Sequence, residues 1–244
     1  MLARRDLSVR YKQTLIGVAW VVIRPLLTVV LLTFVFGKVA ALPSDGLAYP
    51  ALVLSGMLVW QLFSGGFAAG AHSLVADQQL ITKVYFPRLV IPLSAILAGT
   101  VDFGITLILV LGVLPFFGWT PSLTLLALPP ILIGLLLFIT ALSLLVAAWN
   151  VRFRDFRYLL PFVLQFGLYA SPVGYLTTAV PANYQWLMYL NPLTTFIDLF
   201  RWALLATPFP PGYALSATGL TTFLLLLLGF SVFRKTEAVY ADII

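Results

Sequence analysis

The chain has 244 residues, of which 61% are hydrophobic and only 9% are charged, and its formal net charge is +6. Soluble domains carry roughly 25% charged residues, so this composition excludes a water-soluble fold. The lack of cysteine and the single histidine, His72, exclude disulfides and thiolate metal sites and nearly exclude histidine-based catalysis. The basic residues flank apolar segments, so the positive charge indicates membrane topology and not nucleic-acid binding.

The first 41 residues are predicted to form two helices that meet at Pro25. Residues 1–23 carry apolar side chains at spacings of three and four, which predicts an amphipathic interface helix on the membrane surface. The apolar stripe comprises Leu7, Tyr11, Leu15 and Val18, with Arg5 and Lys12 on the opposite side. Because proline is favoured as the first residue of a helix, the first membrane span is predicted over residues 25–41, with Arg24 at the cytoplasmic interface.

Further apolar stretches approach the ~20 residues that a helix needs to cross hydrocarbon. They predict spans over residues 52–70, 91–114, 130–149, 158–176 and 214–233. The segment 177–213 is too apolar for a free loop and is interrupted by prolines, so short re-entrant helices in the outer leaflet are predicted there. The whole chain, residues 1–244, is therefore predicted to be a single all-α integral membrane domain with six transmembrane helices.

The distribution of Lys and Arg predicts the orientation of these spans. With the N-terminus inside, most of the basic residues fall on the cytoplasmic side, and only Lys38 and Arg201 fall outside. Because Lys and Arg are concentrated in cytoplasmic loops, both termini of this multi-pass chain are predicted to be cytoplasmic.

Motifs that bind nucleotide or perform hydrolysis are missing from the sequence. A P-loop requires G-x-x-x-x-G-K-[ST], and the only Gly-Lys pair, Gly37-Lys38, is followed by Val39. Neither H-E-x-x-H nor G-x-S-x-G occurs, and no pair of carboxylates is placed for hydrolysis at the membrane surface. The chain is therefore predicted to be neither an ATPase nor another enzyme, and to contain no metal site.

Several short motifs follow one another along the chain. They are RYKQTLIG at 10–17, LITKVYFPR at 80–88, RDFR at 154–157, SPVGY at 171–175, NPL at 191–193 and FRW at 200–202. Together and in this order, they resemble the permease subunits of ABC-2 type polysaccharide exporters, the O-antigen and teichoic acid exporters of bacterial inner membranes. The resemblance covers essentially the whole chain.

The resemblance implies a function and a set of partners. The expected complex is a homodimer of six-span subunits driven by two copies of a separate ATP-binding subunit. It would move an undecaprenyl-pyrophosphate-linked glycan, O-antigen or teichoic-acid-like, outward across the bacterial inner membrane. No cofactor is expected in this chain, because ATP and Mg²⁺ would be bound by the partner subunit. Besides that subunit and the lipid-linked glycan, only membrane lipids are expected as partners, and nucleic acid is not.

Two cytoplasmic sites are carried over from the family. The residues that match its coupling helix, which docks in a cleft of the ATPase, are Gln79, Leu80, Ile81, Lys83, Tyr85 and Phe86. Without the resemblance, the mixture of polar and apolar residues in this loop predicts only a short amphipathic helix that lies on lipid headgroups. The basic residues of the interface helix suit a lipid pyrophosphate, and simple positive-inside anchoring explains them equally well. These residues are Arg5, Arg10, Lys12 and Arg24.

Aromatic residues are expected to line the path, because sugar rings stack their C–H faces on aromatic side chains. The predicted channel-lining residues are Trp60, Phe63, Phe67, Tyr169 and Tyr175. The segment 177–213 is hypothesised to form two short gate helices that close the pore, with Tyr184, Trp186, Tyr189, Phe196 and Trp202 as the outer gate. An interfacial aromatic belt is the alternative for the gate residues, and packing against lipid is the alternative for the span residues.

Two other transport functions stay open at this stage. One is an ABC-2 exporter of a drug, haem or other lipid. The other is a proton-coupled secondary transporter, which would need Asp102, the one ionisable residue near mid-span, to titrate. A structural role for Asp102 is favoured, with hydrogen bonds to Thr100, Thr106 or a neighbouring helix, because no second acid or histidine accompanies it.

Overall fold

The structure is a computed structural model that describes residues 19–78, 87–153 and 155–237. This part of the chain is helical and contains no strand, which confirms the predicted all-α fold for it. The helices are α2 (Ala19–Leu32), η1 (Thr33–Val39), α3 (Tyr49–Ala76), α5 (Val90–Val113), η2 (Leu114–Phe117), η3 (Leu123–Ala127), α6 (Leu128–Arg152), α7 (Phe156–Ala170), η4 (Thr177–Ala179), η5 (Ala182–Tyr184), α8 (Gln185–Met188), α9 (Pro192–Leu205) and α10 (Gly212–Glu237).

Four helical stretches of the described chain are long and apolar enough to cross a membrane. They are Tyr49–Ala76, Val90–Phe117, Leu123–Arg152 and Gly212–Glu237. Each contains or overlaps one of the predicted spans 52–70, 91–114, 130–149 and 214–233. The helices extend beyond the predicted limits because a membrane helix continues past the hydrocarbon core into the headgroup region.

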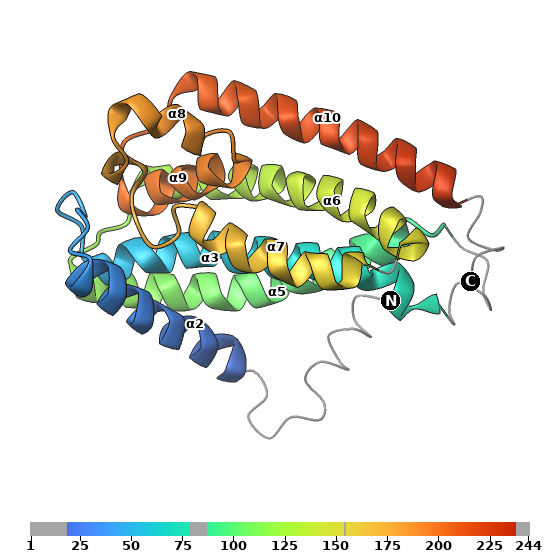
Figure 1. The fold of residues 1–244 in the computed structure, drawn as a ribbon. Helices are drawn as coiled ribbons and strands as arrows, with labels where there is room; N and C mark the ends of the chain where they lie inside the picture. Colours follow the sequence, from blue (N-terminus) through green and yellow to red (C-terminus); the bar gives the residue numbers. More distant parts are fainter. Residues whose placement is uncertain (1–18, 79–86, 154, 238–244) are drawn as a thin grey trace.

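The long helices lie side by side, with α3 in the middle of the bundle (Figure 1). Helix α3 packs against α5, α6 and α9, and α10 packs along the other side of α6. The short helices α8 and α9 and the loop that precedes α3 gather at one end of the bundle. At the opposite end, the guanidinium of Arg88 donates to the carbonyl oxygen of Glu237 and so ties the start of α5 to the last residue of α10.

The predicted helix start at Pro25 is wrong. Helix α2 already includes Ala19, passes through Arg24 and Pro25, and continues beyond Leu32 as the π-helical segment Thr33–Val39. Proline at position 25 removes one backbone donor, yet membrane helices tolerate this because neighbouring groups and local changes of helical pitch satisfy the freed carbonyl. The predicted boundary relied on the preference of proline for a helix start, which is a tendency and not a requirement.

The fifth predicted span, 158–176, is too long at its C-terminal end. Helix α7 stops at Ala170, because Pro172 forces the preceding residue, Ser171, into an extended conformation with φ −102° and ψ 146°. The segment 177–213 contains short helical turns, as predicted, and also the 14-residue helix α9. Helix α9 begins where the side chain of Asn191 accepts a hydrogen bond from Leu193 N, with Pro192 as its first residue.

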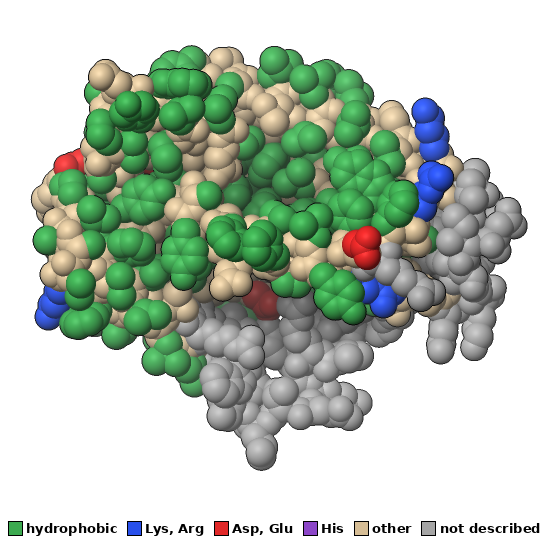
Figure 2. Space-filling model, in the orientation of Figure 1, with side chains coloured by type: hydrophobic (Ala, Val, Ile, Leu, Met, Phe, Trp, Pro, Cys, Tyr) green, Lys and Arg blue, Asp and Glu red, His purple; other side chains and the backbone are tan. Residues whose placement is uncertain are grey.

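The surface of the bundle is apolar. Figure 2 shows hydrophobic side chains over most of one face, with Lys and Arg near the two ends. Large side chains such as Leu27, Ile108 and Leu220 are more than half exposed. In water this arrangement would be unfavourable, but lipid tails are as apolar as leucine, so the exposed surface supports a helical membrane protein.

Candidate functional site

Trp60, Phe63 and Phe67 form one stacked row on α3, and this row is buried. The centroids of Trp60 and Phe63 are 5.7 Å apart, and those of Phe63 and Phe67 are 5.6 Å apart. Phe63 also stacks on Phe138 of α6 at 5.9 Å, and Phe138 contacts Phe196 of α9 at the same distance. These rings are at most 7% exposed, so they pack α3, α6 and α9 together in the core of the bundle.

Helix α7 lies against this row. A Cβ atom at Gly167 would stand 3.0 Å from the indole of Trp60, so only glycine leaves ordinary contact distance between the α7 backbone and the ring. The close approach means that the buried rings support α7 from behind. Trp60 therefore lies between the core of the described chain and α7, a helix that also carries an exposed aromatic face.

That face consists of aromatic residues at spacings of four, four and three along α7. They are Tyr158, Phe162, Phe166 and Tyr169, and each is at least 57% exposed. The centroids of the Phe162 and Phe166 rings lie 4.4 Å apart. We call these four residues the aromatic strip of α7. Of its four residues, only Tyr169 was predicted as a channel residue. The spacing was visible in the sequence, but it could not reveal which neighbouring helix leaves this face uncovered.

Tyr175 lies just beyond α7. Its hydroxyl donates to the carbonyl oxygen of Tyr169 at 3.3 Å, and its ring packs edge-on against Phe36 of η1 at a centroid distance of 6.4 Å. The predicted pair Tyr169 and Tyr175 is therefore brought together, at the junction of α7 with the segment that follows it.

The five predicted gate residues occupy different environments. Tyr184 and Trp186 are more than half exposed, whereas Phe196 is buried in the aromatic row described above. Trp202 is half-buried and packs edge-on against Phe209 at 4.9 Å. Tyr189 is half-buried and donates from its hydroxyl to the carboxylate of Asp198. The structure thus separates one core residue from four residues at the end of the bundle.

Arg201 is the largest fully buried side chain of the described residues, with 1% exposure. Its Nη1 donates to the carbonyl oxygen of Tyr175 at 2.9 Å, and its Nη2 donates to that of Val173 at 3.0 Å. A weaker bond of 3.4 Å joins Nη2 to the carbonyl oxygen of Leu52 in α3. One guanidinium therefore connects α9, α3 and the irregular segment that follows α7.

Two further side chains hold the same segment in place. Tyr49, at the start of α3, donates to the carbonyl oxygen of Gly174 at 2.7 Å, and Asn191 donates to the hydroxyl of Ser171 at 2.9 Å. At Gly56 an added Cβ would approach the carbonyl oxygen of Val173 to 2.4 Å, so only glycine allows α3 to lie this close. The SPVGY, NPL and FRW motifs of the sequence therefore meet in one structural unit.

Asp198 lies one turn before Arg201 on α9. Its Oδ2 accepts hydrogen bonds from Thr177 Oγ1 at 2.8 Å and from the Tyr189 hydroxyl at 3.1 Å, while its Oδ1 is 3.8 Å from Arg201 Nη1. Burial raises the pKa of this carboxyl, and Arg201 and the two hydroxyl donors oppose that rise. Asp198 and Arg201 thus hold residues 173–189 onto α9 with buried polar contacts.

Sequence reasoning missed this role of Arg201 and did not single out Asp198. Arg201 was counted as an outside charge and as part of the FRW motif, and neither a charge count nor a motif takes account of burial. A signal was nevertheless present, since an Asp and an Arg three residues apart face the same side of a helix and can neutralise each other.

The predicted cytoplasmic sites cannot be placed. The coupling residues Gln79, Leu80, Ile81, Lys83, Tyr85 and Phe86 lie outside the described residues, as do Arg5, Arg10, Lys12 and the side chain of Arg24. Asp102 is half-buried in α5, and the hydroxyls of Thr106 and Thr100 donate to the carbonyl oxygens of Asp102 and Leu97. These two hydroxyls are therefore engaged by the helix backbone.

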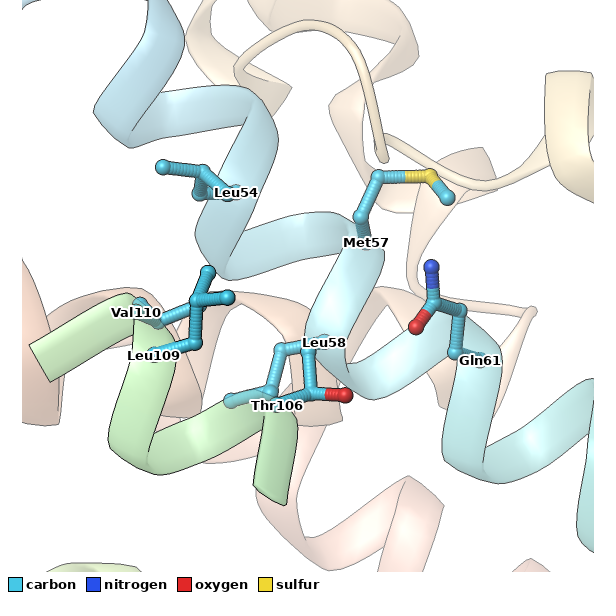
Figure 3. Close-up of a pocket in the computed structure, with 7 residues that line it drawn as sticks. All are labelled: Leu54, Met57, Leu58, Gln61, Thr106, Leu109 and Val110. Carbon is cyan, nitrogen blue, oxygen red and sulfur yellow. The ribbon is translucent and has the colours of Figure 1, made fainter. Parts of the chain in front are cut away.

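A small internal cavity lies between α3 and α5. Within the described ranges, no group of three or more His, Asp or Glu side chains could hold a metal ion. Figure 3 shows residues that line the cavity, among them Met57 and Gln61 from α3 and Thr106 and Leu109 from α5. Its volume of about 10 Å³ admits no more than about one water molecule, so it cannot bind a substrate.

Comparison with known proteins places this geometry in context. A family model described as ABC-2 type transporter matches residues 1–205. The O-antigen export system permease protein RfbA of Klebsiella pneumoniae is 29% identical over 245 residues, which cover 100% of this chain and 93% of that protein. The protein of the same name from Myxococcus xanthus is 28% identical over 99% of this chain and 93% of its own length. The polysialic acid transport protein KpsM of Escherichia coli is 22% identical over 96% of this chain and 91% of that protein.

Proposed function

Because the chain belongs to the ABC-2 type transporter family, we propose that it is the channel-forming permease subunit of an ATP-driven polysaccharide exporter. The proposed substrate is a lipid-linked glycan, O-antigen or teichoic-acid-like and carried on undecaprenyl pyrophosphate, which crosses the bacterial inner membrane. Full-length similarity to two O-antigen export permeases and to a polysialic acid transport protein supports this substrate class.

The structural observation that carries the proposal is the exposed aromatic strip of α7. Four rings cover the length of one helix, and tyrosine supplies a hydroxyl at each end of the strip. Stacking on such rings is broad and depends on no single directional bond, so a sugar chain can slide along them. A lipid-facing helix has no need of this arrangement, because aliphatic side chains pack equally well against lipid tails.

The proposed channel lies between the α7 faces of two protomers in a homodimer. In this arrangement Tyr169 and Tyr175 line the outer part of the path. Trp60, Phe63 and Phe67 support α7 from inside the protomer through the contact of Trp60 with Gly167. Their predicted role as channel wall stays a prediction, and it would require α3 and α7 to separate during transport.

Six spans are proposed for each protomer. Helices α3, α5, α6 and α10 supply four of them, and α2 with η1 and α7 supply the other two. Helix α7 has 15 residues, which corresponds to a length of about 22 Å, so the irregular residues after Ala170 would complete the crossing of a ~30 Å core. Both termini are proposed to be cytoplasmic, which places α8, α9 and the Asp198–Arg201 contacts at the outer end, where residues 177–213 act as the gate.

The proposed complex contains two copies of a separate ATP-binding subunit, which bind ATP and Mg²⁺. The segment 79–86 would transmit the motion of that subunit through Tyr85 and Phe86. Replacing both residues by alanine should leave ATP hydrolysis by the complex intact while surface glycan is lost. The purified permease alone should hydrolyse no ATP.

The decisive experiment removes the central rings of the α7 strip. Phe162→Ala combined with Phe166→Ala should reduce export of long glycan strongly, measured as cell-surface polysaccharide, while complex assembly and basal ATPase activity remain normal. The matched control is Phe223→Ala combined with Phe230→Ala, which removes two exposed rings from α10. Equal export by both double variants would place the α7 strip in lipid and would remove the main structural support for a glycan channel.

A further inference from the structure

A cavity of about 330 Å³ lies at the end of the bundle that carries α8 and α9. It is lined by the loop before α3, by residues 176–178, by α9 and by the segment that links α9 to α10. We call it the Asp198 cavity. Its volume falls within the range of small-molecule sites, roughly 300 to 1,000 Å³, and is sufficient for a sugar ring.

Some polar groups of Asp198 and Arg201 lack a hydrogen-bond partner within the described residues. Asp198 Oδ1 and Arg201 Nη1 are 3.8 Å apart, which is too long for a direct hydrogen bond. Arg201 Nε is buried and has no hydrogen-bond partner among the described residues. A hydroxyl group accepts and donates at once, so it can accept from Arg201 Nη1 and donate to Asp198 Oδ1.

Further polar groups surround this pair. Tyr189 and Thr177 give their protons to Asp198 Oδ2, so their oxygens remain available as acceptors for a second hydroxyl. Asp45 adds a second carboxylate, which accepts a hydrogen bond from Thr178 at 2.8 Å. The cavity therefore offers several acceptors and a few donors to a polyhydroxylated ligand.

The charge of the lining selects among ligands. Two carboxylates and one guanidinium line the cavity, so it has no excess of positive charge to attract a phosphate, a pyrophosphate or an acidic sugar. The lining also contains apolar side chains, among them Phe209, Pro208, Pro210 and Pro211. A lining that combines a carboxylate, a guanidinium and an aromatic ring suits a neutral sugar, whose hydroxyls are polar and whose C–H face is apolar.

A second cavity at the same end serves as a contrast. Its volume is about 300 Å³, and its lining includes Phe117, Trp119, Thr120 and Ser122 but no charged side chain. It therefore has similar size and position without the carboxylate and guanidinium. A property that depends on volume alone should be shared by both cavities.

We propose that the Asp198 cavity is a binding site for one neutral sugar unit, held by hydroxyl hydrogen bonds to Asp198, Arg201 and Tyr189 and by stacking on Phe209. The proposal rests on the proposed function, since it assigns the site to the exported glycan. Asp198 also holds Thr177 and Tyr189 of the proposed gate, so a sugar in this cavity would contact the carboxylate that keeps those residues in place.

The test measures binding to the full-length chain in lipid nanodiscs by saturation-transfer NMR. The probes are the methyl glycosides of glucose, galactose, mannose and N-acetylglucosamine, with inorganic pyrophosphate and calcium chloride titrated separately. Saturable binding of at least one glycoside is expected. Asp198→Asn, which keeps the shape of the side chain, should weaken it by about tenfold or more, because a charged hydrogen bond is lost.

Asp198→Asn also weakens the contacts of Asp198 with Thr177 and Tyr189, so two tryptophan variants test glycoside binding without changing Asp198. Thr207→Trp fills the Asp198 cavity without changing Asp198, Arg201 or Tyr189, and should abolish glycoside binding. Thr120→Trp fills the uncharged cavity and should leave binding unchanged. Normal size-exclusion profiles establish that the variants are folded.

The inference is overturned if no glycoside binds the wild-type chain, if the two tryptophan variants behave alike, or if only pyrophosphate or calcium binds. Surface glycan is measured in parallel in cells lacking the chain. Normal surface glycan in those cells would contradict the proposed function, whereas the measured glycoside binding would still stand. If the wild-type chain restores surface glycan in those cells but binds no glycoside, the sugar site in the Asp198 cavity is contradicted and the proposed export function stands.

Discussion

Two aromatic regions of this protein have similar composition and opposite environments. On α3, α6 and α9, Trp60, Phe63, Phe138 and Phe196 stack on one another and are no more than 7% exposed. On α7, Tyr158, Phe162, Phe166 and Tyr169 are between 57% and 83% exposed. Trp60 of the buried set also lies close to the backbone of α7 at Gly167.

The difference shows how a membrane protein divides the same residue type between packing and surface. The buried rings connect three helices and therefore define the shape of the protomer. The exposed rings contribute little to that shape, since they have few neighbours within the chain, and are free to contact lipid, a second protomer or a substrate. The predictions below separate these roles by stability and by transport.

The largest loss of stability is expected from Arg201→Met. The substitution leaves the carboxylate of Asp198 buried without its cation and frees the carbonyl oxygens of Val173 and Tyr175. Removing one partner of a buried ion pair costs about 3 to 5 kcal/mol. Thermal unfolding of the purified protein in detergent would measure this loss. A variant as stable as the wild type would show that water replaces the guanidinium and that the contacts are not structural.

A somewhat smaller loss is expected from Phe138→Ala in the buried aromatic row. Truncation of a buried phenylalanine costs about 3 to 5 kcal/mol in soluble proteins, and the lower end applies here because lipid tails also dissolve the exposed apolar surface. Phe162→Ala is the control, since the same truncation removes an exposed ring. If both variants unfold at the same temperature, the aromatic row does not hold α3, α6 and α9 together.

The contact between the two regions is tested by Gly167→Ala. The added methyl group would stand 3.0 Å from the Trp60 ring and would push α7 away from α3, whereas alanine at Gly112 of α5 meets no atom within 4 Å. Alanine favours a helix over glycine by about 1 kcal/mol, and overpacking costs about 1 to 3 kcal/mol. Gly167→Ala should therefore be less stable than Gly112→Ala by roughly 1 to 3 kcal/mol in parallel thermal denaturation. Equal stabilities would mean that α7 is not seated on Trp60.

The smallest effect on stability, and the largest on transport, is expected on α7 itself. Phe162→Ala should change the free energy of unfolding by no more than about 0.5 kcal/mol, because exposed positions rarely contribute more. In an export assay with a long glycan, the same variant should reduce transport, while Phe223→Ala on α10 should not. If Phe162→Ala reduces stability and leaves export normal, the α7 rings serve packing and not substrate contact.

Much of the fold could be predicted from local sequence. Apolar length located the helices α3, α5, α6 and α10. The rule that proline is favoured as the first residue of a helix was wrong at Pro25, where α2 continues through the residue. A rule about a preferred position cannot exclude a helix whose backbone is satisfied by its surroundings.

The candidate site was less predictable. Recurrence of aromatic residues on α3 correctly indicated a shared face, since their rings stack, yet it could not show that α6 and α7 cover that face. The strip on α7 has an equally regular spacing and stays uncovered. Periodicity reports which side chains point the same way, and only the packing of other helices decides whether they meet protein, lipid or substrate.

By itself, the sequence determined that this is a helical membrane protein without a nucleotide-binding loop, and it carried the motifs of its family, because composition and short motifs are properties of neighbouring residues. Only the tertiary structure decided what Arg201 does. Its partners are carbonyl oxygens from α3 and from the segment after α7, together with Asp198 on its own helix. Such a guanidinium is stable away from water only where the folded chain brings those oxygens together, so its role exists in the packing and not in the local sequence.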